Sequence, residues 1–375
     1  MNWRWPPRPV AMLYLALSIG TAFMHAALVD HPLARDRRMG MAVAILAGQG
    51  PAPDQYRPLV HWMAAGLQTA GLDFDAAYNL IRAAGTFASA GLVHGLLARW
   101  YAPWACLVGT LWLLAALPLT YLHYYFQPTD PLNLAAFVAC AHLLASRKDA
   151  ACLALAAAGM IQRETQLMLA PFYLWLRYDE LCLPRLLGRA AVGTVVLGAV
   201  YLGIRHIYGV RPYYTDRFVL LADNLFHWRA WTYLLLLFGP AVALAIRAES
   251  PAPRFFRRAV GWAPFFLGGH YLVTAAEECR LWLPLMPFAI GLALAGLPGA
   301  LVNRDDKSPV GADLQVGPSW LAVHWRAAYA ALFLAFCASM LAFAHVTQER
   351  HVAGLSEGMN RLNVPGVHPE IQVIK

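Results

Sequence analysis

The chain has 375 residues, of which 59% are hydrophobic and only 13% are charged. This composition excludes an ordinary soluble protein, because no soluble core needs so much apolar sequence, and it predicts a polytopic membrane protein. The formal net charge of +8 does not indicate nucleic-acid binding, since the basic residues lie in short clusters between apolar segments, as membrane orientation requires.

Apolar segments near the roughly 20 residues that cross a bilayer recur along the chain. The first is predicted at 10–29. Basic residues precede it and no small-residue cleavage site follows it, so we interpret it as an uncleaved signal anchor. Residues 30–75 are too charged to span and are predicted to form a large outer loop. Within it, MGMAVAILAG and LVHWMAAGL are expected to be short helices lying on the interface.

Further apolar segments follow this loop. They are predicted at 78–98, 103–122, 131–145, 150–161, 166–176, 190–207, 231–246, 260–275, 281–302 and 321–344. The fold class is therefore expected to be all-α, a polytopic transmembrane helical bundle of about 11 spans. Residues 1–346 are expected to form a single transmembrane domain with a flexible cytoplasmic insertion at 303–320, followed by a polar extracytoplasmic tail at 347–375.

The basic residues predict an orientation, because loops rich in Lys and Arg stay on the cytoplasmic side. Placing the N-terminus inside makes every short inner loop basic. The inner residues are then Arg4, Arg8, Arg99, Arg147, Lys148, Arg177, Arg185, Arg189, Arg247, Arg254, Arg257, Arg258, Arg304 and Lys307. The same choice gathers the acids at the membrane edge on the outer side, namely Asp36, Asp54, Asp130, Glu164, Glu277 and Glu278.

An Arg-Glu-Thr turn, with Arg163 and Glu164, separates two apolar segments that are each below a full span. Charge at membrane depth is costly unless it is paired or faces water, so this turn predicts a cavity around it. Neighbours on a helix point about 100° apart, so each charge is expected to engage a partner on another helix. Glu277 and Arg280, three residues apart, either do the same or neutralise each other on one face.

Three aspartates of the predicted outer side also have ordinary interpretations. Asp36 suits a helix N-cap, and Asp54 suits a turn beside prolines. Asp130 comes before a proline at a helix start, where capping is again expected. Arg57, in the sequence YRP, is suited to a phosphate or to a lipid headgroup.

The order of these features resembles the GT-C integral-membrane glycosyltransferases. The similarity covers most of 10–298. It consists of a first span, an early Asp36 in a large outer loop, an amphipathic helix ending in Gly, the sequence YRPL, a later Asp130 followed by proline, the RET turn and a late ECRLWLPLMP segment.

The resemblance implies a membrane enzyme of the cell envelope that acts in glycan biosynthesis. Such an enzyme moves a hexosyl or pentosyl unit from a polyprenyl-phosphate-linked sugar to a glycan, lipid or protein acceptor. The implied location is a bacterial inner (plasma) membrane, with a site that faces the periplasm or cell exterior, membrane lipids as further partners and no nucleic acid. Asp36 is the implied catalytic base. Some members carry two adjacent acidic residues at this position, whereas here Asp36 is followed by Arg37 and Arg38. The resemblance therefore leaves open whether a divalent cation (Mg or Mn) is a cofactor.

The chemistry of such a transfer suits these residue types. An inverting transfer needs one carboxylate to accept the proton of the acceptor hydroxyl, because phosphate is already a good leaving group. Arginine binds the departing phosphate bidentately. The candidate phosphate ligands are Arg163, Arg280 and Arg57. Residues expected to bind or orient the substrate are Glu164, Glu277, Asp130 and Tyr56.

A transporter or a flippase for lipid-linked glycans is the alternative, since the same charges can line a substrate path. The sequence shows no internal repeat, and its charges gather at one predicted face instead of the midplane, so we favour the transferase.

Overall fold

The computed structural model describes residues 5–29, 32–121, 129–209, 211, 221–248, 252–273 and 278–302. Within these ranges the protein is helical and has no β-strand; Tyr101 and Leu301 form an isolated antiparallel bridge. The predicted all-α class is confirmed to this extent. The predicted segment at 321–344, the insertion at 303–320, the tail at 347–375 and Glu277 lie outside the described residues.

A helix is present in each predicted apolar segment that the structure describes, although several begin or end elsewhere. The helices are α1 (Arg8–Val29), α2 (Pro32–Leu46), α3 (Leu59–Thr69), α4 (Phe74–Leu97), α5 (Pro103–Ala116), α6 (Asp130–Ala145), α7 (Asp149–Gly159), α8 (Leu169–Arg177), α9 (Leu183–Tyr208), α10 (Leu221–Phe226), α11 (Trp228–Ile246), α12 (Arg254–Gly261), α13 (Ala263–Val273) and α14 (Met286–Leu294). Among them, α9 begins seven residues before its predicted start, and α14 ends eight residues before the predicted end of its segment. Short 3-10 helices are η1 (Asp54–Tyr56), η2 (Leu117–Tyr121), η3 (Glu164–Met168) and η4 (Cys279–Leu285).

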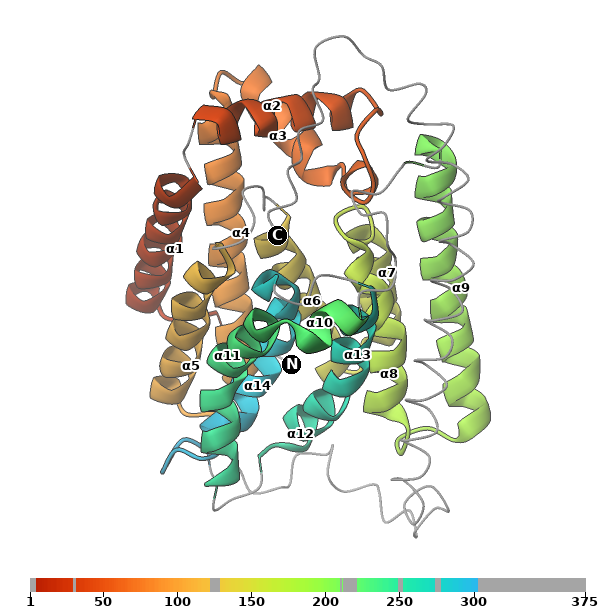
Figure 1. The fold of residues 1–375 in the computed structure, drawn as a ribbon. Coiled ribbons are helices and arrows are strands. Elements are labelled where there is room, and N and C mark those ends of the chain that lie inside the picture. Colours follow the sequence, from red (N-terminus) through yellow and green to blue (C-terminus); the bar gives the residue numbers. More distant parts are fainter. Residues whose placement is uncertain are drawn as a thin grey trace.

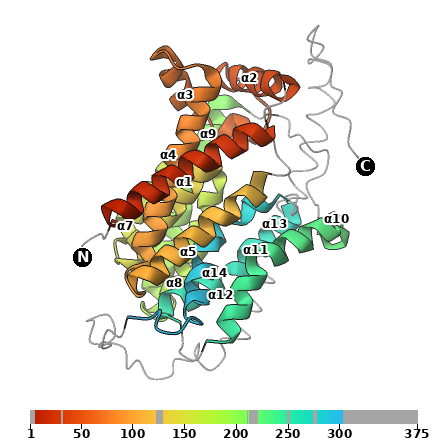
Figure 2. The ribbon, with the colours of Figure 1, turned by 90° about the vertical axis from the view of Figure 1, so that its left-hand side faces the viewer.

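The long helices form a bundle with α2 and α3 lying across one end of it (Figure 1). A view from the side shows the same two helices crossing that end (Figure 2). The helix α9 stands at the edge of the bundle (Figure 1). The two helices expected in the large outer loop are thus present; their position on a membrane surface stays a prediction.

Four of the described helices are long and apolar enough to cross a membrane. They cover Arg8–Ala27, Phe74–Leu97, Pro103–Thr120 and Leu183–Tyr208. Other predicted segments are shorter apolar helices, at Asp130–Ala145, Asp149–Gly159, Trp231–Ile246 and Arg280–Leu294. The segment predicted at 260–275 is two helices, α12 and α13, which meet at the fully buried Trp262. These helices are consistent with a membrane protein. The number of spans, about 11, stays a prediction.

The helix α4 packs closely against the first turn of α6. A Cβ atom at Gly85 of α4 would lie 3.1 Å from the backbone nitrogen of Leu132, so a larger residue would push the helices apart. The Ser89 hydroxyl donates a hydrogen bond to the carbonyl of Pro131 (2.9 Å). The first turn of α6, which carries Asp130, is therefore held against α4.

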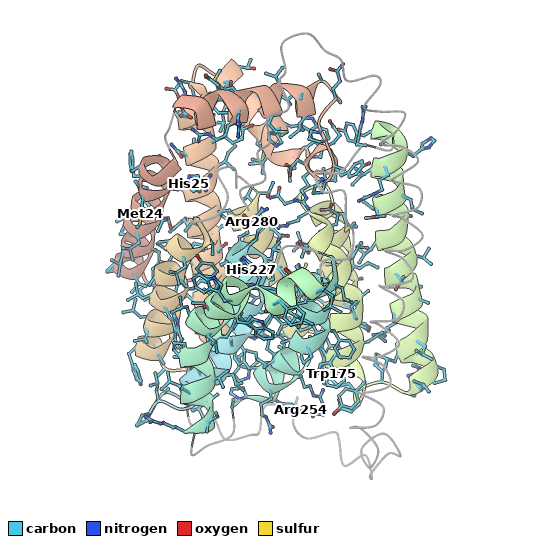
Figure 3. The ribbon with its side chains drawn as sticks, viewed as in Figure 1. Met24, His25, Trp175, His227, Arg254 and Arg280 are labelled. Carbon is cyan, nitrogen blue, oxygen red and sulfur yellow. The ribbon has the colours of Figure 1, made fainter. Side chains whose placement is uncertain are left out.

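A set of ion pairs and hydrogen bonds joins helix ends at the end of the bundle opposite α2 and α3. Arg254, labelled in Figure 3, belongs to this set. We call it the basal network; it comprises Arg147, Arg177, Arg189, Arg254, Arg258, Asp149, Asp179 and Glu180. Its centre is the buried Arg177, which donates to Asp149 (2.9 Å), to Glu180 (2.6 Å) and to the carbonyl of Leu144 (2.6 Å). The ends of α6, α7, α8, α9 and α12 are tied together in this way.

Candidate functional site

Asp130, the first residue of α6, is 3% exposed and accepts hydrogen bonds from two arginines. One is the 4% exposed Arg163, and the other is Arg280, whose Nη1 lies 3.4 Å from Oδ2 of Asp130. The N-cap of α6 is Thr129, and it makes no side-chain capping bond. The capping interpretation of Asp130 is therefore wrong. Its carboxylate compensates two buried guanidinium groups, 33 and 150 residues away.

Arg163 and Glu164 have different partners although they are adjacent. Arg163 has an extended backbone (φ −168°, ψ 138°) at the start of η3, and successive side chains of an extended chain point to opposite sides. Arg163 therefore reaches Asp130, while Oε2 of Glu164 accepts a hydrogen bond from Nε of Arg57 at 2.7 Å. Partners on other helices were expected for both residues; this is confirmed for Arg163, whose partner lies on α6, whereas the closest partner of Glu164 is Arg57, which follows the 3-10 helix η1.

Arg57 and Glu164 are both held in the charged form. Burial alone opposes the charge of Arg57, but Glu164 and Asp54 raise the pKa of Arg57 above its usual value. Burial likewise opposes the charge of Glu164, yet Arg57 lowers the pKa of Glu164. Asp54 lies 3.6 Å from Nη1 of Arg57. The loop between α2 and α3 is thus fastened to the turn before α8 by an ion pair.

Arg205 in the last turn of α9 completes this side of the site. Its guanidinium lies 4.2 Å from the ring centre of Tyr56 and 3.4 Å from that of Tyr201, both cation–π contacts. Its Nη2 is 3.9 Å from Oε1 of Glu164. The Tyr56 hydroxyl donates to the carbonyl of Gly209 (3.1 Å). Sequence reasoning missed Arg205; the available signal was an arginine near the end of a long apolar helix.

Arg280 brings η4 into the same group of charges. Its Nε and Nη2 donate to Oε2 of Glu278 at 3.0 and 2.6 Å, and Nη1 reaches Asp130. In Figure 3, Arg280 lies in the interior of the bundle, on the side of α2 and α3. The pairing of Arg280 with a neighbouring acid is thus made by Glu278, while Glu277 is outside the described residues.

These contacts form one group, which we call the central charge cluster. It comprises Arg57, Arg163, Arg205, Arg280, Asp54, Asp130, Glu164 and Glu278. The two halves meet at the adjacent residues Arg163 and Glu164, which pair with Asp130 and with Arg57 respectively. Asp130 and Arg163 form the buried floor, whereas the side chains of Glu164, Arg205 and Glu278 are 18%, 18% and 24% exposed.

Buried amides hold the turn before α8 against α6. Gln162 donates to the carbonyl of Thr129 (2.6 Å), and Gln166 donates to Oδ1 of Asn133 (3.0 Å). Both glutamines are at most 2% exposed, so these bonds are worth more than bonds at the surface. Their role is to place Arg163 beside Asp130.

Asp36 is not brought to the central charge cluster. It lies within α2, which begins at Pro32, so the N-cap interpretation is wrong. Its side chain is exposed. Its neighbours Arg35 and Arg38 pair with Asp75 of α4, at 2.7 and 3.4 Å. Within the described part of the chain, no ion pair joins Asp36 to an arginine of the cluster.

The described residues contain no group of three or more His, Cys, Asp or Glu side chains that would hold a metal ion. Each described carboxylate of the central charge cluster instead faces an arginine. Participation of Mg or Mn stays a prediction.

Comparisons with protein-family models, with curated proteins and with solved structures found no match to this chain.

Proposed function

We propose that the protein is a glycosyltransferase of the GT-C type, which moves a sugar from a polyprenyl-phosphate donor to an acceptor at the outer face of a membrane. The observation that carries the proposal is the convergence of four arginines from η1, η3, η4 and α9 on one group of carboxylates, with Arg280 inside the bundle on the side of α2 and α3 (Figure 3). Arginine forks in a low-dielectric site suit an anionic phosphate that enters from a bilayer.

Arg57 and Arg280 are the best-placed ligands for the donor phosphate. Each is paired with a partly exposed glutamate, Glu164 or Glu278, which a phosphate can displace without disturbing a fully buried pair. Arg205 lies beside Glu164 and adds positive charge on the same side. The displaced glutamates are then free to accept hydrogen bonds from sugar hydroxyls.

Arg163 acts through Asp130 in this proposal. A direct contact between Arg163 and phosphate requires that the 3% exposed Asp130 gives up its partner, which is costly for a buried charge. Arg163 instead supplies positive potential from the floor of the site and keeps the first turn of α6 in place. We therefore expect substitutions of Arg163 to affect stability more than donor binding.

Asp36 remains the proposed base, because it is an exposed carboxylate on a helix that covers this end of the bundle. The base accepts the proton of the acceptor hydroxyl, the new bond forms between that oxygen and the anomeric carbon, and the bond to the donor phosphate breaks with inversion. Asp54 is the competing candidate, since it comes from the same loop and lies 3.6 Å from Arg57.

The test is to incubate the purified protein with a panel of polyprenyl-phosphate sugars and to measure released polyprenyl phosphate by mass spectrometry. Asp36→Asn is expected to lower turnover by about a hundredfold or more while leaving donor binding intact, and Asp54→Asn, the variant of the competing candidate, is expected to lower turnover less. A larger loss of turnover in Asp54→Asn than in Asp36→Asn would identify Asp54 as the base. Donor movement across vesicle membranes without any bond cleavage would contradict the transferase and indicate a flippase.

A further inference from the structure

The helix α9 presents a face that changes from basic to apolar along its length. Arg185, Arg189 and Val192 are spaced i, i+4 and i+7, so they lie on one face of the helix. All three are exposed, with Val192 at 57% and the nearby Val195 at 69%. Only 11% of the most apolar stretch of α9 is buried in the protein. The basic end of this face adjoins the basal network.

The basal network carries a surplus of positive charge. Its five described arginines share three described carboxylates. Arg177 and Arg258 are its buried members, whereas Arg147, Arg189 and Arg254 are 52%, 55% and 49% exposed. Lys148, Arg185 and Arg257 add further exposed charge beside it. An anion is therefore attracted more strongly to this surface than to one on which positive and negative charges are equal in number.

Arg185 and Arg189 are close enough to share one ligand group. Residues four apart on a helix have Cβ atoms about 5–6 Å apart, so both guanidinium groups can reach a single phosphate. Arg189 already donates to Asp149 at 3.0 Å, and this bond fixes its side chain while leaving more than half of it exposed. The phosphate contact thus has one arginine that is already positioned by Asp149 and a second arginine, Arg185, that is exposed on the same face.

We propose that the N-terminal half of α9 binds an anionic phospholipid, with its phosphate on Arg185 and Arg189 in the first two turns and an acyl chain along Val192 and Val195 in the next two. Charge complementarity selects an anionic headgroup, and the apolar continuation of the same face selects a lipid instead of a free phosphate. The orientation predicted from the basic loops puts this lipid in the cytoplasmic leaflet. The proposal does not depend on the glycosyltransferase activity.

The experiment uses the purified full-length protein in neutral detergent. It is titrated with phosphatidylglycerol, with phosphatidylcholine of the same acyl chains, and with inorganic phosphate; bound lipid is counted by native mass spectrometry and thermal stability is followed in parallel. Phosphatidylglycerol is expected to bind and to raise the melting temperature, and the other two probes to do neither. Equal retention of the two lipids, or equal stabilisation by inorganic phosphate, overturns the proposal.

Variants locate the site. Arg185→Gln/Arg189→Gln is expected to weaken phosphatidylglycerol binding by about fivefold for each arginine, and Val192→Ser to weaken it without a change of charge. Arg35→Gln/Arg37→Gln is the matched control, because Arg35 is also an exposed arginine paired with an aspartate (Asp75, 2.7 Å) and Arg37 is exposed. Unchanged binding in the first double variant would show that no lipid site exists on α9, and equal losses in the two double variants would show that exposed arginines attract the lipid without a specific site; either result overturns the proposal.

Discussion

The central charge cluster and the basal network both pair arginines with carboxylates, but they join different kinds of segment. The basal network links helix ends at short connections, and its outer arginines are about half exposed. The central charge cluster links η1, η3 and η4 with α6 and α9, and its floor is 3–4% exposed. Exposed pairs contribute little to stability, whereas breaking a buried pair is costly.

The difference indicates two uses of the same chemistry. In the basal network, Leu144 and Leu176 offer their carbonyls to Arg177 and Arg258, so these arginines also complete helix C-termini. The central charge cluster instead joins loops and 3-10 turns to the first turn of α6 and the last turn of α9, inside an apolar bundle. These pairs hold distant segments together, but the 18–24% exposure of Glu164, Arg205 and Glu278 also leaves charge accessible at membrane depth, which supports the proposed function in binding.

The largest expected effect is on the free energy of unfolding, when the buried pair of Asp130 and Arg163 is broken. Asp130→Asn leaves Arg163 and Arg280 without their shared carboxylate and is expected to lower the free energy of unfolding by about 3–5 kcal/mol. Asp149→Asn in the basal network should cost about 1 kcal/mol, because its carboxylate is 21% exposed and Arg177 keeps Glu180. Thermal unfolding in detergent measures both; similar losses would remove the distinction between the two regions.

The second effect depends on pH. Because the pKa of Glu164 is lowered in the folded protein, its stabilising contribution is present above the unfolded pKa, near 4.5, and is lost as the pH falls through the folded value. Glu164→Gln is expected to cost about 2 kcal/mol at pH 7. The same difference should persist at pH 5 and should shrink only below pH 4.5. A difference that already disappears between pH 7 and 5 would mean that Arg57 does not hold this carboxylate.

A third prediction separates binding from stability. Arg57→Lys keeps the charge but loses the bidentate fork, so donor affinity is expected to fall by about tenfold with little change in melting temperature. Arg177→Lys, in the basal network, should lower the melting temperature and leave donor affinity unchanged. Isothermal titration or competition with a labelled donor measures the affinities. Equal donor losses in both variants would contradict a phosphate site in the central charge cluster.

The smallest effect is expected at the rim of the basal network. Arg254→Gln removes an arginine that is 49% exposed and leaves Arg258 on Asp179, so the change in unfolding free energy should be about 0.5 kcal/mol and should vanish at high salt. A loss above about 2 kcal/mol, measured by the same thermal unfolding, would show that this rim is as strongly coupled as the buried floor.

The sequence by itself determined where most helices lie along the chain and that the adjacent charges Arg163 and Glu164 have separate partners. Apolar runs place α1 and α4 within four residues of their predicted bounds, since a helix satisfies its own backbone in an apolar setting, whereas α9 begins seven residues before its predicted start. The opposite destinations of Arg163 and Glu164 were also predictable, because adjacent side chains diverge.

Only the tertiary structure decided which charges meet. Asp130 joins Arg163 and Arg280 across 33 and 150 residues, and Arg205 reaches Glu164 from the end of α9. No periodicity encodes these pairings, because they depend on how helices pack and not on spacing along the chain. Asp36 falls inside α2 instead of at its start because the helix begins at Pro32, a residue suited to a first helical turn. Its carboxylate consequently stays exposed, outside the charges that the fold gathers.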